Sequence, residues 1–279
     1  MSRLRWLLSH PEFRRHPVQV SSGVVSWEIH KLLSRNMLLE LDGLKLTARP
    51  VDGNGRLICY FGTKFDSVFE FLKMFLQKGM VFVDVGSNIG SHTLNAARLV
   101  GSTGSVFAFE ADPDTYNLLV KNIEFNNLTN VTVKRTCVSD QVGTVSFYKH
   151  RDSAKSSIVD RGEKLSLTLP AEMLDNLIPI NTKIDILKVD VEGAELNVLR
   201  GARRIFLDQR PPSVVIIEVF DVRDNTDKSQ GIRDILDKYG YKFYLFEGGR
   251  LTPFSGSALN AYALHELALP QVLAKFLPD

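Results

Sequence analysis

Acidic residues stand at or just beyond the ends of three successive apolar, strand-like runs. Asp84 lies near the end of residues 81–85, Glu110 ends residues 105–110, and Asp140 follows residues 131–138. The carboxyl ends of parallel strands meet at one rim of a sheet, where ligands bind. There Glu110 could accept hydrogen bonds from the hydroxyls of a ribose, and Asp140 could accept one from an adenine amino group. A lone acid after a strand usually belongs to a turn or a cap, but three on one rim indicate a binding site.

A glycine-containing loop follows the first of these runs. Gly86 and Gly90 let the chain turn tightly and let a ligand approach the backbone. A helix predicted to begin near Ser91 would direct its free N–H groups toward that ligand. An ordinary strand–helix turn that happens to contain two glycines is the alternative. The sequence of this loop is DVGSNIG over residues 84–90.

The loop argues against a bound pyrophosphate. A dinucleotide fingerprint needs glycine at positions 88 and 91, because the backbone packs against the phosphates, and this chain has Asn88 and Ser91. Asp84 is a poor neighbour for a phosphate and a good one for an ammonium group. The residues therefore favour a nucleoside that carries an amino acid and no phosphate. S-adenosylmethionine meets that description.

Three carboxylates are candidates for the chemical step. Transfer of a methyl group to a hydroxyl requires an aligned acceptor and a base that takes the hydroxyl proton. Asp190 is the first candidate, since it directly follows the fourth apolar run, residues 184–189; Glu192 is the second and Glu218 the third. Asp190 could instead bind the cofactor or cap a helix, and Glu192 could hold Lys188 or a backbone amide. No metal site is predicted.

Regular alternation of apolar runs and amphipathic segments must position these residues. A helix is predicted over residues 65–77, strands over residues 81–85, 105–109, 131–138, 184–189 and 214–219, and closing strands over 241–246 and 260–265. Helices are expected between them, one of them with Asp112 as N-cap and Pro113 as first residue. Continuous apolar strands separated by helices predict an α/β fold with a mostly parallel sheet and helices on both faces.

The first sixty residues lack this pattern. A helix around residues 27–39 and a hairpin across 41–58 are expected, because Pro50, Gly53 and Gly55 are turn signals. We therefore expect residues 1–60 to form a helical and hairpin extension and residues 61–279 to form the cofactor-binding domain. From its position, the extension is predicted to cover the substrate side.

Composition limits the possible classes of protein. Hydrophobic residues make up 44% and charged residues 24% of 279, and the net charge is +2, which is typical of a globular protein and gives no strong field for nucleic acid. Cys59 and Cys137 lie in apolar runs, where buried thiols are expected. No signal peptide or membrane span is predicted. The expected location is cytoplasmic, and the oligomeric state stays open.

Together these motifs resemble the FkbM-type S-adenosylmethionine-dependent methyltransferases from about residue 60 to 265. The matching segments are VDVGSNIG (83–90), FEA (109–111), VSD (138–140), SS (156–157), LDNL (174–177), KVDVEGAE (188–195), VLRGA (198–202), Glu218 and Asn260. The segment around Asp190 is the most specific. Departures are Asp66, Ser87 and residues 172–175, where the family often has glutamate, alanine and a Thr-Leu-Asp pattern.

The resemblance implies a Rossmann-like class I methyltransferase sheet with an antiparallel last strand. It also implies methylation of a hydroxyl on a sugar, glycan or small secondary metabolite. The cofactor site is expected to comprise Asp84, Gly86, Ser87, Asn88, Gly90, Glu110, Ala111, Ser139 and Asp140.

Three other functions compete with this interpretation. A nicotinamide-dependent oxidoreductase is disfavoured by Asn88 and Ser91. A nucleic-acid methyltransferase is disfavoured because residues 190–193 read DVEG, where amino-methylating enzymes carry an Asn/Asp-Pro-Pro-Tyr motif. A non-catalytic, nucleoside-cofactor-binding partner protein would not require all of Asp84, Glu110, Asp140 and Asp190 to be intact, and a turnover assay separates it from an enzyme.

Overall fold

An eight-stranded, mostly parallel sheet forms the centre of the molecule. The computed structural model describes residues 3–150, 152, 155–160, 162, 165–218, 227–254 and 260–276, with the side chains of residues 3–4, 218 and 227–228 excepted. The strand order is β12-β11-β13-β10-β9-β3-β4-β5. The strands are β3 (Val81–Val85), β4 (Ser105–Glu110), β5 (Val131–Arg135), β9 (Ile186–Val189), β10 (Val214–Glu218), β11 (Tyr241–Glu247), β12 (Arg250–Pro253) and β13 (Asn260–His265).

The last strand in the chain runs against its neighbours, as expected. Strands β3, β4, β5, β9 and β10 pair in parallel. Strand β13 is antiparallel to both β10 and β11, between which it lies. The predicted α/β fold, with a mostly parallel sheet and an antiparallel last strand, is therefore confirmed.

Helices cover both faces of this sheet because side chains alternate along each strand. On β3, Val83 and Val85 pack in a core cluster with residues of α9, α10 and α11, whereas Phe82 packs in a cluster with residues of α5, α6 and α12. The helices are α5 (Ser67–Phe75), α6 (Ser91–Val100), α7 (Pro113–Phe125), α8 (Leu174–Leu177), α9 (Glu195–Arg200), α10 (Arg203–Phe206), α11 (Asp227–Lys238) and α12 (Leu269–Ala274). Asp112 caps α7 before Pro113, as predicted.

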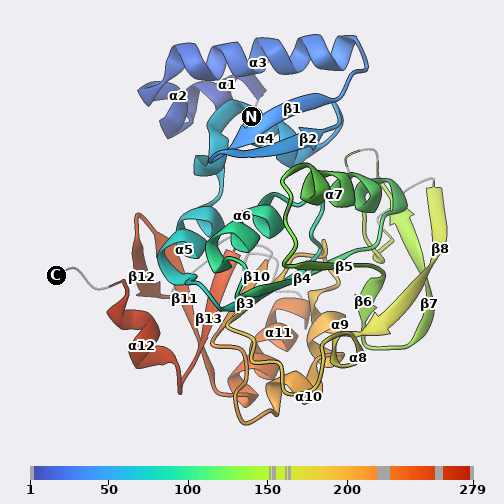
Figure 1. The fold of residues 1–279 in the computed structure, drawn as a ribbon, viewed down its shortest axis with the longest axis vertical. Coiled ribbons are helices and arrows are strands. Elements are labelled where there is room, and N and C mark those ends of the chain that lie inside the picture. The colour runs from blue at the N-terminus through green and yellow to red at the C-terminus, as the bar shows by residue number, and fades with distance from the viewer. Residues whose placement is uncertain are drawn as a thin grey trace.

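The N-terminal elements lie together at one end of the molecule, with α3 outermost (Figure 1). They are α1 (Arg3–Ser9), α2 (Pro11–Arg15), α3 (Pro17–Leu32), the hairpin β1 (Met37–Leu41) and β2 (Leu44–Ala48), α4 (Gly53–Phe61) and the short 3-10 helix η1 (Gly62–Phe65). The long helix thus begins and ends earlier than the predicted 27–39, and the hairpin earlier than 41–58.

Two glycines explain the misplaced hairpin. Gly53 and Gly55 are not turn residues but belong to α4. At Gly55 an added Cβ would lie 2.4 Å from the Cβ of Ala48 and 3.2 Å from the ring of Trp27, so glycine lets the helix pack closely on the hairpin. The true turn is Asp42-Gly43, with φ of 50° and 82°, a pair typical of tight hairpins.

A second, three-stranded sheet lies beside β5. It has the order β6-β8-β7 and consists of β6 (Cys137–Ser139), β8 (Leu165–Met173) and β7 (Gly143–Lys149). The predicted strand 131–138 is therefore two strands in different sheets. The chain leaves the main sheet at Thr136, whose hydroxyl donates a hydrogen bond to the carbonyl of Pro170 in β8 at 3.2 Å.

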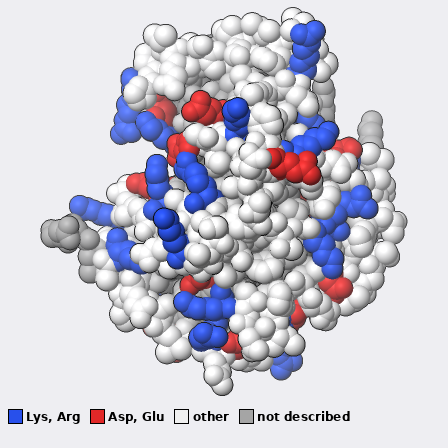
Figure 2. Space-filling view, in the orientation of Figure 1, with Lys and Arg blue, Asp and Glu red and all other residues white. Residues whose placement is uncertain are grey.

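The surface carries both signs of charge. Figure 2 shows basic and acidic side chains interspersed over the face in view. In the described part of the chain, no helix has both the length and the apolar character needed to cross a bilayer.

Candidate functional site

A cavity of about 550 Å³ opens at the carboxyl ends of β3, β4 and β9. Elements of four kinds line it: the glycine loop, the strand ends, the small sheet with its adjoining loop, and the N-terminal extension. Its lining includes Asn54, Leu57, Asp66, Gly86, Asn88, His92, Glu110, Ala111, Thr136, Cys137, Val138, Ser157, Lys188, Asp190, Glu192, Glu247 and Asn260. The cavity is large enough for a small-molecule ligand.

The glycine loop folds over the end of β4. The amides of Gly86 and Ser87 both donate to the carbonyl of Phe109 at 3.0 Å. Gly86 has φ +83°, and a Cβ there would lie 1.8 Å from the carbonyl oxygen of Asp190. Only glycine can therefore bring this loop against the end of β9. Gly90, with φ 95°, occupies the N-cap position of α6.

Ser87 holds the loop together. Its hydroxyl donates to the carbonyl of Asp84 at 2.8 Å and accepts from the amide of Phe109 at 3.1 Å. The side chain is buried, and its hydrogen bonds tie the loop to β3 and β4. Its contribution to the site is thus to shape the backbone.

Glu110 is fixed by the backbone at the edge of the cavity. One carboxylate oxygen accepts from the amide of Asn88 at 2.8 Å, and the other accepts from the amide of Asp112 at 2.8 Å. Burial raises the pKa of Glu110 to about 7 in spite of these hydrogen bonds. Because each carboxylate oxygen can accept more than one hydrogen bond, Glu110 and the neighbouring Ala111 present an oriented acceptor to the cavity.

Asp84 lies behind the loop, not on the cavity wall. It is fully buried, accepts from the hydroxyl of Thr93 at 2.6 Å and has the Nζ of Lys188 at 3.5 Å. Lys188 also donates to Asp190 at 3.0 Å. Burial alone would lower the pKa of Lys188, but Asp190 and Asp84 raise it. Asp84 is therefore paired with a cation of the chain itself.

The segment after β9 places two of the predicted catalytic residues in the cavity wall. Asp190 and Glu192 both line the cavity. Glu192 has φ 56°, and the loop around it is held by Glu195, whose Oε1 accepts from the amides of Val191 and Gly193 at 3.2 and 2.9 Å. Burial raises the pKa of Glu195. The backbone of Glu218 pairs with Asn260, and its side chain lies outside the described residues.

Ser139 and Asp140 are not among the residues that line the cavity. The Oδ1 of Asp140 accepts from Ser139 at 3.2 Å and from Asn197 of α9 at 3.1 Å. The expectation that Asp140 lies on the rim is corrected, because the chain has already turned into the small sheet at Thr136. In its place Thr136, Cys137 and Val138 line the cavity.

Asp66 and His92 are a pair in the cavity that sequence reasoning missed. The Oδ2 of Asp66 lies 3.1 Å from the Nε2 of His92, while its Oδ1 accepts from the amide of Val68 and so caps α5. Burial would raise the pKa of Asp66, but the contact with His92 lowers it. An aspartate just before a helix was an available cap signal; nothing in the spacing links it to His92.

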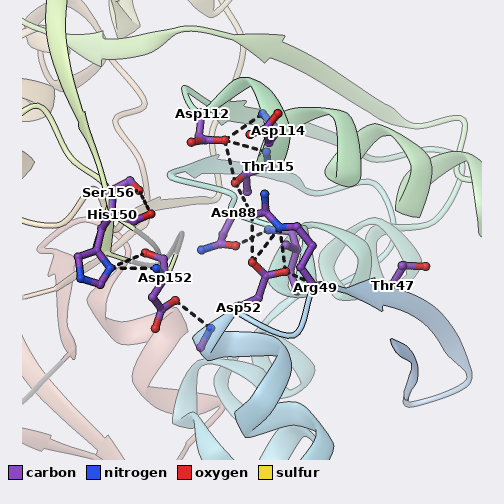
Figure 3. Close-up of polar contacts among 12 residues, drawn as sticks. Thr47, Arg49, Asp52, Asn88, Asp112, Asp114, Thr115, His150, Asp152 and Ser156 are labelled. Atoms are coloured by element: carbon purple, nitrogen blue, oxygen red, sulfur yellow. Dashed lines mark hydrogen bonds and ion pairs between the residues drawn. The ribbon is translucent and has the colours of Figure 1, made fainter. Parts of the chain in front are cut away.

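The N-terminal extension contributes Asn54 and Leu57 of α4 to the cavity wall. Figure 3 shows the polar contacts that hold this region. Arg49 reaches Asp52 at 3.0 Å and the hydroxyl of Thr115 in α7 at 2.9 Å. On the other side, Asp152 accepts from the amide of Gly53 at 2.9 Å. The extension is therefore fastened to the sheet domain beside the cavity.

Comparison with known proteins gives a family match over the sheet domain. A model described as the methyltransferase FkbM domain matches residues 84–243, which is more than half of the chain. A hexuronic acid methyltransferase, AglP, from Haloferax volcanii is 36% identical over 123 residues, covering 43% of this chain and 49% of that protein. Methyltransferase 1 from Beauveria bassiana is 24% identical over 182 residues, covering 57% and 71%.

A crystal structure of methyltransferase FkbM from Methylobacillus flagellatus KT is 19% identical, with a TM-score of 0.44, over 67% of this chain and 43% of that chain. The match to the Haloferax protein spans about half of that relative's length.

Proposed function

Because this chain belongs to the FkbM methyltransferase family, we propose that it transfers a methyl group from S-adenosylmethionine to a hydroxyl of a sugar, glycan or small secondary metabolite. The observation that carries this is the placement of Glu110. Its carboxylate is oriented by two backbone amides and faces the same cavity as the Gly86 loop. Membership of a methyltransferase family also argues against the alternative of a nicotinamide-dependent oxidoreductase.

The chemistry of the cavity fits the proposed cofactor. Asp66, Glu110, Asp190, Glu192 and Glu247 give the described lining more carboxylates than cations. Such a lining suits a cationic sulfonium and an ammonium group and opposes a pyrophosphate. When bound, the cofactor would supply an electrophilic methyl group on sulfur.

The chain's own residues divide the binding task. Glu110, with Ala111 beside it, would accept the ribose hydroxyls, and the Gly86-Ser87-Asn88 backbone and Gly90 would shape the wall along the cofactor. Asp190 would accept the ammonium group, while Asp84 acts through Lys188. Thr136, Cys137 and Val138, which line the cavity, would lie along the base, where the sequence suggested Ser139 and Asp140.

The remaining wall would receive the acceptor. Asn54 and Leu57 from the extension, residues 1–60, line the same cavity as Glu247 and Asn260 of the sheet domain, residues 61–279. We therefore propose that the extension covers the acceptor side. The sugar-acid methyltransferase among the relatives supports a sugar as the acceptor here.

Turnover decides between an enzyme and a non-catalytic binding protein. Purified protein would be incubated with methyl-labelled S-adenosylmethionine and a panel of hexoses, hexuronic acids and small phenols, with heat-treated protein as control. Label recovered as a methyl ether on a sugar hydroxyl supports the proposal. Binding of the cofactor without transfer to any member of the panel would instead support the binding protein.

A further inference from the structure

His92 lines the cavity from the first turn of α6. Its side chain is almost completely buried, yet it contributes to the cavity wall. The ring packs against Phe69 of α5, with centroids 4.5 Å apart, so its orientation is restricted. Asp66, immediately before α5, faces one edge of the ring. Two helices thus hold an imidazole and a carboxylate together beside the cavity.

The contact with Asp66 selects one tautomer of His92. The Nε2 atom is buried, and no contact to it within the described residues meets full hydrogen-bond geometry. The Oδ2 of Asp66, 3.1 Å away though off the ideal hydrogen-bond direction, is the acceptor within reach. An ionised carboxylate can only accept, so Nε2 carries the hydrogen. Nδ1 then has a free lone pair, and no described residue donates to it.

From this geometry we propose that His92, oriented by Asp66, is the general base that removes the proton of the acceptor hydroxyl. The proposal rests on the proposed function. An imidazole with a carboxylate behind it is suited to this role, because the carboxylate fixes the tautomer and stabilises the imidazolium that forms.

Nearby charges favour the same assignment. Asp66 interacts with Lys188 electrostatically, and Lys188 is itself balanced by Asp84 and Asp190. These groups together place more negative than positive charge around the ring. Asp190 is less suitable as the base, since a proton on its carboxyl would weaken the contact with Lys188 at 3.0 Å. The first candidate from the sequence is thereby assigned to binding.

Atoms and charge balance in this step. The acceptor O–H bond breaks and its proton passes to Nδ1 of His92. The oxygen's electron pair forms the bond to the methyl carbon, and the pair of the broken carbon–sulfur bond stays on sulfur. One positive charge is lost at sulfur and one is gained on the imidazole, which then releases its proton to solvent.

The test uses the full chain with three substitutions and needs readouts besides activity. In ¹⁵N-histidine spectra of the wild type, the His92 signal, identified by its absence from His92→Gln, should show the Nε2–H tautomer, and Asp66→Asn should change it. Calorimetry should give His92→Gln the same affinity for S-adenosylmethionine as the wild type, within about threefold. His30→Gln, on α3, is the matched control and should leave every readout unchanged.

With an acceptor from the panel of hexoses and hexuronic acids, kcat of His92→Gln should fall by about 10²- to 10⁴-fold, the range expected for loss of a general base.

An Nδ1–H tautomer, unchanged kcat, or cofactor affinity lowered more than about tenfold in His92→Gln would overturn the proposal. The last result would make His92 a cofactor-binding residue. Failure of the wild type to bind S-adenosylmethionine would instead contradict the proposed function. If the wild type binds S-adenosylmethionine but methylates no member of the panel, the proposed transfer to a hydroxyl is contradicted, and with it the role of His92 that rests on it.

Discussion

The ammonium group of Lys188 lies 3.0 Å from the carboxylate of Asp190, and it also reaches the buried carboxylate of Asp84 at 3.5 Å. Lys188 thereby joins the rear of the glycine loop to the cavity wall. The two carboxylates lie at the ends of β3 and β9, strands that pair directly. The position of Asp190 therefore depends on this cation.

Substitution of Lys188 by methionine should strongly destabilise the fold. Asp84 would keep only the hydroxyl of Thr93 as a hydrogen-bond donor among the described contacts, and breaking a buried ion pair costs about 3–5 kcal/mol. Urea denaturation would measure the loss in the free energy of unfolding. The exposed Lys31, paired with Glu28 on α3, gives the control: Lys31→Met should change stability by less than about 0.5 kcal/mol. Equal effects of the two variants would contradict the described pairing.

Gly86→Ala should lower both the stability and the S-adenosylmethionine affinity more than the same substitution at another glycine with positive φ. Its Cβ would meet the Asp190 carbonyl at 1.8 Å, so the loop must move away from β9. Gly248 has φ +56° with nothing within 4 Å of an added Cβ, and Gly248→Ala should cost only about 1–2 kcal/mol of backbone strain. Thermal unfolding and S-adenosylmethionine affinity would both be measured. Comparable losses in the two variants would show that the contact with Asp190 does not matter.

Glu110 should make the fold less stable as the pH rises from about 4.5 to about 7. Burial raises the pKa of this group from 4.5 to about 7. Between these values the folded state holds more protons than the unfolded state, so the free energy of unfolding falls with rising pH. The fall due to Glu110 should approach about 3 kcal/mol, because a pKa difference of one between the two states corresponds to about 1.36 kcal/mol. Urea denaturation at pH 5 and pH 8 would measure it.

Glu110→Gln serves as the comparison, since it cannot ionise and should lose this part of the pH dependence. Glu195, whose pKa burial also raises, contributes in the same direction in both proteins and cancels in the difference. An identical pH dependence in wild type and variant would show that Glu110 titrates normally.

Arg49→Met should weaken binding of the acceptor more than binding of the cofactor. The substitution removes the contacts to Asp52 and Thr115 and so loosens α4, which supplies Asn54 and Leu57 to the cavity. We expect KM for the acceptor to rise about 5- to 30-fold, which corresponds to 1–2 kcal/mol, with cofactor affinity unchanged. Steady-state kinetics would measure this, with the exposed Arg15→Met as control. A selective loss of cofactor affinity would contradict the proposed role of the extension.

The central sheet could be predicted from the sequence because its strands are continuous apolar runs. Almost all described side chains of β3, β9 and β10 are buried, on both faces of the sheet, so burial leaves a pattern that can be read without any tertiary information. The glycine loop could also be predicted from the sequence. Its Gly86 has φ +83° and lies against the backbone of Asp190, so no other residue fits there. Glu110 ends β4 where the sequence placed it.

The rest of the site depends on packing that leaves no local pattern. Cys137 and Val138 are apolar and buried whether the chain stays in the main sheet or leaves it, so the position of Asp140 could not be inferred. Asp66 meets His92 only because α5 packs beside α6. In the extension, by contrast, Pro17 at the start of α3 and the Asp42-Gly43 turn were signals that could have corrected the boundaries.

Calorimetric titration with S-adenosylmethionine is the decisive experiment for the assignment of this cavity as its binding site, with NAD as a second ligand and Glu110→Ala as the variant. We expect the wild type to bind S-adenosylmethionine and not NAD. We further expect Glu110→Ala to bind S-adenosylmethionine at least about tenfold more weakly, since hydrogen bonds to a charged acceptor are worth about 1.5–3 kcal/mol. Binding of NAD alone, or undiminished binding of S-adenosylmethionine by the variant, would contradict the assignment of this cavity.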